Sequence, residues 1–226
     1  MSIDTSTSLG ALVAERPARA RFFERLHLDY CCGGSDSLAE ACARRGLDAD
    51  TVAELLAALD ESPARPDPAE ELDWRRASIA ELCDHIVLVH HANLRTELPR
   101  IAELLATVVR VHGKGHPELH DLERSFATMR ADLEHHIDLE ERVLFPACRG
   151  DAGATLDTET LALLEHEHTD TGRSLTALRE LANDYDRERA LCATHRTLLD
   201  ALQRLELDLH QHIHEENNLL FPRVHL

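Results

Sequence analysis

The chain writes one eleven-residue pattern twice. HIDLEERVLFP occupies residues 136–146, and HIHEENNLLFP occupies residues 212–222. Each copy places a histidine four residues before a glutamate, and such a pair shares one face because an α-helix advances about 100° per residue. Apolar residues precede each histidine at helical spacing, in line with the same face. Each copy therefore predicts a histidine and a glutamate that point into a helical core.

The two copies belong to a series of four long helical patterns. They cover roughly residues 78–112, 117–148, 156–183 and 187–221, with polar or glycine-containing connections between them. Long helices joined by short loops predict an all-α, up-down four-helix bundle over residues 77–226. Shorter helical patterns predict a small helical domain over residues 1–59, and closely spaced prolines predict a linker over residues 60–76.

The composition excludes several classes of function. The formal net charge is -18, with 42 acidic against 24 basic residues, so nucleic acid and anionic membranes are repelled. No apolar run approaches the roughly 18 residues that a membrane span needs, and no signal segment is evident. We therefore expect a cytoplasmic protein that binds neither nucleic acid nor membranes.

The two inward glutamates predict a metal centre. An ionised carboxylate in a helical core costs several kcal/mol unless a positive charge compensates it. The two other long helices each carry a histidine on an apolar stripe, His91 and His168. These histidines precede His136 and His212 by nearly the same number of residues, so the sequence indicates that a whole helix pair is duplicated. The predicted ligands are four imidazoles and two carboxylates: His91, His136, Glu140, His168, His212 and Glu216.

This donor set favours iron. Nitrogen and oxygen ligands without a thiolate suit iron better than a structural zinc site. Two non-haem iron ions bridged by the carboxylates and an oxo group keep about two positions open for dioxygen or nitric oxide. A ferritin-like scheme remains an alternative, because Glu165 and His168 have its Glu-x-x-His spacing. Asp132 and Asp208, one turn before the repeated histidines, either accept hydrogen bonds from the ligands or face solvent.

A second motif, LDYCCGG, occupies residues 28–34. Adjacent Cα atoms lie about 3.8 Å apart, below the usual disulfide range, so Cys31 and Cys32 are expected as free or transiently oxidised thiols. Gly33 and Gly34 permit a sharp turn that exposes the sulfurs. Cys31 and Cys32 are candidate catalytic residues, and the alternative is two small buried side chains before a turn.

Together these motifs resemble the repair of iron centres family, of the YtfE/ScdA type, over nearly the whole chain. The resemblance rests on LDYCCGG, a proline-containing linker that ends in DW, EHEHTDTG and the two repeated stretches. It implies a haemerythrin-like bundle whose non-haem di-iron site falls on the six residues named above. One departure is Asp132, where relatives can carry glutamate.

The resemblance also implies a function. We expect repair of iron–sulfur clusters damaged by oxidative or nitrosative stress, by a supply of iron, with damaged iron–sulfur proteins as partners. Two alternatives stay open: reduction of nitric oxide at the di-iron centre, and haemerythrin-like binding and sensing of dioxygen or nitric oxide. The sequence decides neither whether the protein is an enzyme nor whether it forms a homodimer.

Overall fold

The computed structural model describes residues 3–61, 74–151 and 156–224. Within these ranges the regular structure is helical, apart from one isolated antiparallel bridge between Ser8 and Ser37, which confirms the all-α prediction. The predicted linker at residues 60–76 lies largely outside the described residues. Two compact units form, Cys83–Leu209 and Met1–Leu82 together with His210–Leu226.

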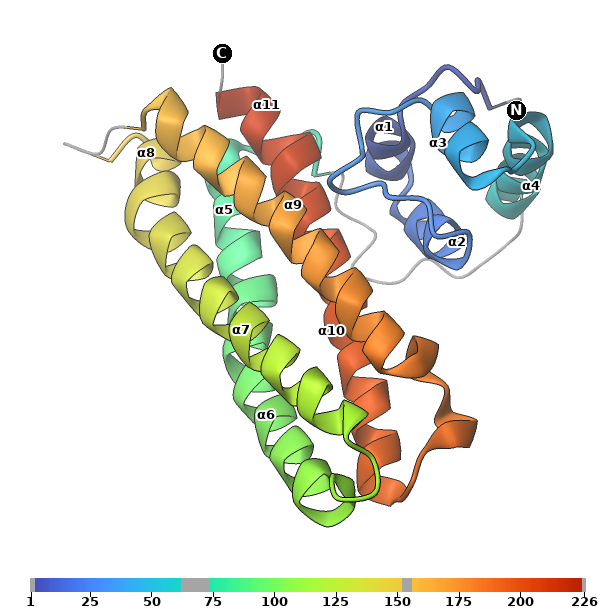
Figure 1. The fold of residues 1–226 in the computed structure, drawn as a ribbon. Coiled ribbons are helices and arrows are strands. Elements are labelled where there is room, and N and C mark those ends of the chain that lie inside the picture. Colours follow the sequence, from blue (N-terminus) through green and yellow to red (C-terminus); the bar gives the residue numbers. More distant parts are fainter. Residues whose placement is uncertain (1–2, 62–73, 152–155, 225–226) are drawn as a thin grey trace. The chain divides into compact units, whose positions relative to one another are not determined.

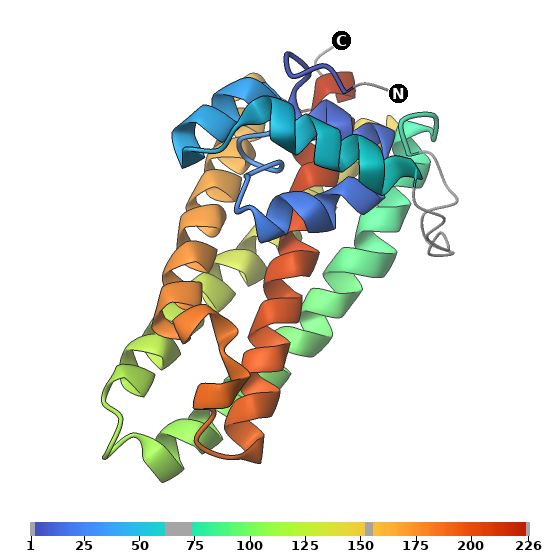
Figure 2. The ribbon, with the colours of Figure 1, turned by 90° about the vertical axis from the view of Figure 1, so that its right-hand side faces the viewer.

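Four long helices make up the bundle, and Figures 1 and 2 show them running side by side in alternating directions. Their bounds are α6 Ala92–His112, α7 Glu118–Leu139, α9 Thr158–Leu181 and α10 Ala193–Glu215. The shorter α5, Ile79–His85, leads into α6, and α8, Phe145–Arg149, follows α7. The predicted four-helix bundle is confirmed.

Capping side chains mark where these helices begin. The Ser78 hydroxyl accepts from the backbone N–H of Glu81 at 3.2 Å, and the Glu81 carboxylate accepts from the Ser78 backbone at 2.8 Å, so α5 starts with a capping box. Asp157 caps α9 by accepting from the Thr160 backbone N–H at 2.7 Å. Such side chains satisfy backbone donors that a helix leaves open at its first turn.

Leucine-rich stripes of the four helices pack against one another in the unit Cys83–Leu209. Leu98, Leu133 and Leu209 are each 2% exposed or less and belong to one continuous core. Phe126 and Met129 fill the same core between the helices. Burial of this much apolar surface stabilises the bundle and fixes which face of each helix points inward.

Within the part of the chain that the structure describes, three π-helical segments interrupt the helices at predicted ligands. They span Ile86–His91, Glu140–Leu144 and Glu216–Leu220. In the last two, the backbone N–H of the phenylalanine that follows donates to the carbonyl of the glutamate five residues earlier. Pro146 and Pro222 come next, and a proline crowds the carbonyl four residues before it, which a wider turn relieves. The repeated FP therefore places a wide turn directly after each glutamate.

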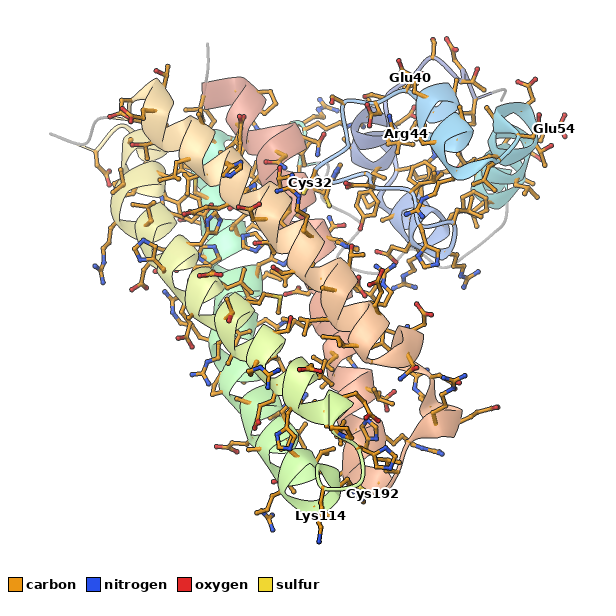
Figure 3. All side chains as sticks on the ribbon, viewed as in Figure 1. Cys32, Glu40, Arg44, Glu54, Lys114 and Cys192 are labelled. Atoms are coloured by element: carbon orange, nitrogen blue, oxygen red, sulfur yellow. The ribbon has the colours of Figure 1, made fainter. Side chains whose placement is uncertain are left out.

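The other unit holds the N-terminal helices and the end of the chain. Its helices are α1 Leu9–Glu15, α2 Ala20–Arg25, α3 Leu38–Arg45, α4 Ala49–Glu61 and the C-terminal α11 Phe221–Val224, with a 3-10 turn at Pro17–Arg19. A separate apolar core containing Phe23 and Leu38 lies among the N-terminal helices. Figure 3 labels Cys32, which lies in the loop between α2 and α3.

Candidate metal centre

The carboxylate of Glu140 faces histidines through both of its oxygens. Its Oε2 lies 3.3 Å from Nε2 of His91, while its Oε1 lies 3.3 Å from Nε2 of His136 and 4.0 Å from Nε2 of His168. The Glu140 side chain is fully buried, and the three histidines are 5% exposed or less. The two oxygens of this buried carboxylate therefore face different histidines.

The imidazoles of His136 and His168 approach each other closely. Their Nε2 atoms are 3.0 Å apart, and the rings meet edge to face. Neighbouring positions around one octahedral cation, at bond lengths of about 2.1 Å, are separated by about 3.0 Å. The distance between the two nitrogens is thus one at which both can bind a single ion.

The second copy repeats the local geometry. Nε2 of His212, near the end of α10, lies 3.2 Å from Oε1 of Glu216, and both residues are 1% exposed or less. Leu205 and Leu209, earlier on the same helix, are buried members of the bundle core. The predicted inward face thus holds along α10, as it does along α7.

The donor set fits metal cations. Imidazole nitrogens and carboxylate oxygens are the ligands of non-haem iron, manganese and zinc, and the described ligand positions contain no thiolate. Glu140 and Glu216 are each 0% exposed, and ionised carboxylates at such depth need compensating positive charge. The residues present therefore fit the metal centre that the sequence predicts.

Two further carboxylates orient the histidines from behind. Nδ1 of His91 donates to Glu141 at 2.8 Å, and Nδ1 of His136 donates to Glu167 at 2.7 Å. Each hydrogen bond places the proton on Nδ1 and turns Nε2 toward Glu140 with its lone pair available. The hydrogen bond from His136 holds the pKa of Glu167 below its usual range despite partial burial.

Glu141 has an additional cationic partner. Arg95 donates to the same oxygen that accepts from His91, at 2.7 Å, and also lies 3.5 Å from Asp138. Burial favours the neutral form of Glu141, but the hydrogen bonds from Arg95 and His91 outweigh it and lower the pKa of that carboxyl. Glu141 therefore stays ionised and keeps the His91 ring in position.

The structure also shows where the acidic residues near the predicted ligands lie. Asp132 is exposed, and Asp208 pairs with Nδ1 of His90 at 3.0 Å and with Asn93 at 3.0 Å. Glu165 is exposed on α9, so the ferritin-like scheme, which needs this glutamate inside the bundle, is wrong. Sequence reasoning missed Glu141 as an orienting residue. It lies 50 residues from His91, and local spacing carries no signal for such a pair.

The turn with the vicinal cysteines is organised by Asp29. Its Oδ1 accepts from the backbone N–H of Cys31 at 3.1 Å and of Cys32 at 3.0 Å, and from the Cys31 thiol at 3.2 Å. The two sulfurs are 3.9 Å apart and are not joined by a disulfide, as expected. The expectation that the turn exposes both sulfurs is wrong for Cys31, which is buried at the turn, whereas Cys32 is partly exposed.

Residues from the second copy hold this turn. The Asn218 side-chain amide donates to the Cys31 carbonyl at 3.2 Å, and Nδ1 of His214 donates to the Tyr30 carbonyl at 3.3 Å. Gly34 makes the approach feasible, because a Cβ atom there would lie 2.4 Å from the Asn218 side chain. The second glycine of CCGG is thus explained by close packing.

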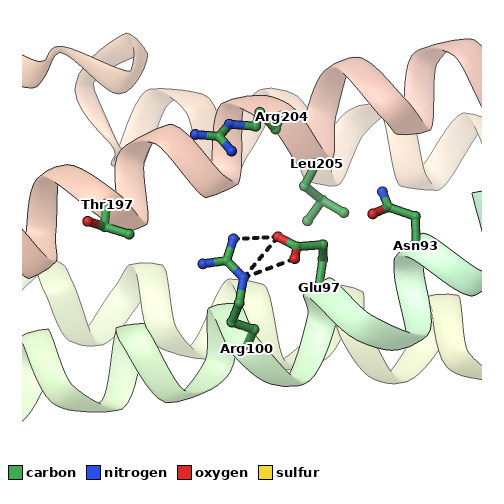
Figure 4. A pocket seen from close by; sticks show the side chains of 6 residues that line it. All are labelled: Asn93, Glu97, Arg100, Thr197, Arg204 and Leu205. Carbon is green, nitrogen blue, oxygen red and sulfur yellow. Dashed lines mark hydrogen bonds and ion pairs between the residues drawn. The ribbon is translucent and has the colours of Figure 1, made fainter.

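A pocket of about 410 Å³ lies elsewhere in the bundle unit (Figure 4). It is lined by Asn93, Glu97, Arg100, Thr197, Arg204 and Leu205. Arg100 donates to the Glu97 carboxylate and lowers its pKa, although burial opposes this. None of the predicted metal ligands lines this pocket, so it is not the candidate metal site.

Comparisons with known families agree with the geometry. Residues 83–224 match a family described as "Hemerythrin HHE cation binding domain", and residues 5–60 match one described as "Domain of Unknown function (DUF542)", named ScdA_N. The fold and the donor set are thus those of a haemerythrin-type cation-binding protein. None of the helices described is both long and apolar enough to span a membrane.

Curated relatives extend this likeness over nearly the whole chain. "Iron-sulfur cluster repair protein YtfE" of Pectobacterium atrosepticum is 36% identical over 217 residues, which is 96% of each chain. Proteins of the same name from Edwardsiella ictaluri and Escherichia coli O81 are 37% and 33% identical, over 96% of this chain and 95% of each relative. The chain belongs to this family of iron–sulfur cluster repair proteins.

Proposed function

We propose that this protein repairs damaged iron–sulfur clusters by supplying iron from a dinuclear centre. The observation that carries the proposal is the fully buried Glu140 carboxylate, whose two oxygens each lie 3.3 Å from a different histidine. The name shared by the relatives favours repair over nitric oxide reduction or gas sensing. The clients are iron–sulfur proteins damaged by nitric oxide or oxidants.

The proposed centre uses six residues, His91, His136, Glu140, His168, His212 and Glu216. Support comes from α10, which continues from the buried Leu209 through Glu215, so that His212 and Glu216 follow on the same stripe. Within the unit Cys83–Leu209, the buried side chains of His91, His136, Glu140 and His168 also support it, because Nε2 atoms of the three histidines lie 3.3–4.0 Å from the Glu140 carboxylate.

The protein side chains have distinct tasks in this proposal. The imidazoles hold iron firmly, and the two carboxylates neutralise its charge while offering oxygen ligands that exchange more readily. Glu141 and Glu167 keep two of the imidazoles oriented. The iron ions are the cargo of the reaction, and the bundle keeps them out of bulk solvent until transfer.

Recovery of a damaged client enzyme tests the proposal. A dehydratase whose iron–sulfur cluster has been damaged with nitric oxide is mixed anaerobically with the iron-loaded protein, and its activity is followed. We expect recovery with the wild type and with Glu165→Leu, the same change at an exposed glutamate of the bundle. Recovery should fall by at least tenfold with Glu140→Leu. Equal recovery with Glu140→Leu and wild type would contradict the proposal.

A further inference from the structure

The turn at residues 28–34 gathers a second set of potential metal ligands. The donor atoms of Asp29, Cys31 and Cys32 all lie within 4.8 Å of one another. The two sulfurs are 3.9 Å apart, and the Cys31 sulfur lies 3.2 Å from Oδ1 of Asp29. These three side chains are separate from the six predicted ligands of the dinuclear centre.

Their spacing matches that of ligands around one cation. Two thiolates bound to the same tetrahedral cation at about 2.3 Å are separated by about 3.8 Å. A disulfide needs sulfurs only about 2.05 Å apart, far closer than the pair in this turn. The two sulfurs are therefore spaced as ligands of one cation, and they are not joined as a disulfide.

The surrounding backbone keeps the three donors together. A Cβ atom at Gly33 would lie 2.9 Å from the Asp29 carbonyl and 3.3 Å from its carboxylate, so this glycine leaves room for the carboxylate. The Cys31 carbonyl is held by Asn218. Asp29 is exposed and Cys32 is partly exposed, which gives a cation from solution a route to the buried Cys31 sulfur.

We propose that Asp29, Cys31 and Cys32 bind one thiophilic divalent cation, with ferrous iron as the occupant during repair. Binding replaces two thiol protons: the dithiol and one divalent cation give a dithiolate complex and two protons, with no transfer of electrons. The choice of iron rests on the proposed function, whereas the binding site itself does not. In that function, the turn binds one iron ion on its way from the dinuclear centre to a client.

The protonation state of Cys31 makes cation binding at this turn depend on pH. The hydrogen bond with Cys32 and burial both raise the pKa of the Cys31 thiol, so it is protonated near neutral pH. A cation must therefore displace protons, and its affinity rises with pH.

Cobalt(II) is the probe for the test, because cobalt–thiolate bonds absorb in the near ultraviolet. The full-length, reduced protein with its dinuclear centre already loaded with iron is titrated anaerobically. We expect one cobalt ion per chain with thiolate charge-transfer absorption, retained in Cys192→Ser, lost in Cys32→Ser and at least tenfold weaker in Asp29→Asn. Cys192 is a matched control, a partly exposed cysteine in the other unit.

Two controls keep the outcome decisive. Circular dichroism and the iron content of each variant should equal those of the wild type, so that loss of cobalt binding reports the turn alone. Absence of the thiolate absorption in the wild type, or full absorption in both Cys32→Ser and Asp29→Asn, would overturn the thiol site. Failure of the client recovery assay with intact cobalt binding would overturn the proposed function and leave the thiol site standing.

Discussion

The two copies of the repeated pattern differ in the residues that follow the buried glutamate. In the first copy Glu140 is followed by Glu141, which accepts from His91 and Arg95. In the second copy Glu216 is followed by Asn217 and Asn218, whose amides donate to the Cys31 carbonyl at 3.5 Å and 3.2 Å. The two copies share the proposed ligand positions, but the residues beside these positions have different partners.

The same contrast appears two residues after each histidine. Asp138 of the first copy is half exposed and lies near Arg95. His214 of the second copy is 1% exposed and donates to the Tyr30 carbonyl. At the positions where the copies differ, the first copy has side chains that orient a proposed ligand. The second copy has side chains that hold the cysteine turn. Duplication supplies the symmetric ligands, and divergence gives each copy a separate task.

The largest expected effect comes from the positions that the copies share. Glu140→Leu and Glu216→Leu should each remove most bound iron, because each carboxylate serves both cations of the proposed centre. The metal-free variants should also be at least as stable as the metal-free wild type, since leucine lacks the cost of a buried carboxylate. Iron counting and thermal unfolding of both forms check this. Loss of iron in only one variant would contradict the equivalent roles of Glu140 and Glu216.

Acid should weaken the second copy through His214. Burial lowers the pKa of His214 to about 4, below the value of 6.5 expected in the unfolded chain. The unfolded state binds the proton first, so this contribution to stability is complete above pH 6.5 and is lost as the pH falls toward 4. The loss amounts to roughly 3 kcal/mol.

Replacement of that histidine isolates its contribution. His214→Asn keeps a donor but does not titrate, so its free energy of unfolding should fall less steeply between pH 6.5 and 4 than that of the wild type. Denaturant unfolding of the metal-free proteins at several pH values measures this slope. His166→Asn, at an exposed histidine, is the control and should keep the wild-type loss. Identical slopes for His214→Asn and wild type would contradict the role of burial.

The first copy should be sensitive to the residue after its glutamate. Glu141→Gln weakens the hydrogen bond that orients His91, and we expect metal affinity to fall by about 10- to 100-fold. Competition with a chelator measures this affinity. Asn217→Ala, at the matching position of the second copy, should change metal affinity by less than a factor of about three. Equal losses in the two variants would show that the copies do not differ in this task.

The smallest expected effect concerns the amides of the second copy. Asn218→Ala removes donors to the carbonyls of Cys31 and His214 and should cost about 1–2 kcal/mol of unfolding free energy. Arg142→Ala, at the matching exposed position of the first copy, should cost less than about 0.5 kcal/mol. Denaturant unfolding compares the two. A larger loss in Arg142→Ala would reverse the comparison.

Sequence patterns predicted the bundle because apolar periodicity directly reports which helix face is buried. The same periodicity placed Glu140 and Glu216 inside, and both are fully buried. The π-helical segments escaped prediction, since a change from four- to five-residue hydrogen bonding alters no residue type. Pro146 and Pro222 are the signal that locates two of them in retrospect. Pairs of residues that are distant in sequence, such as Glu141 and His91, could be identified only from the three-dimensional structure.

The most direct measurement is the number and coupling of iron ions in the protein purified without oxygen. Metal analysis and Mössbauer spectroscopy should give two iron ions per chain in one magnetically coupled, non-haem pair, because Glu140 presents its two oxygens to different histidines. A single iron ion, or two uncoupled ions that persist in Glu140→Leu, would contradict the dinuclear centre on which the account rests.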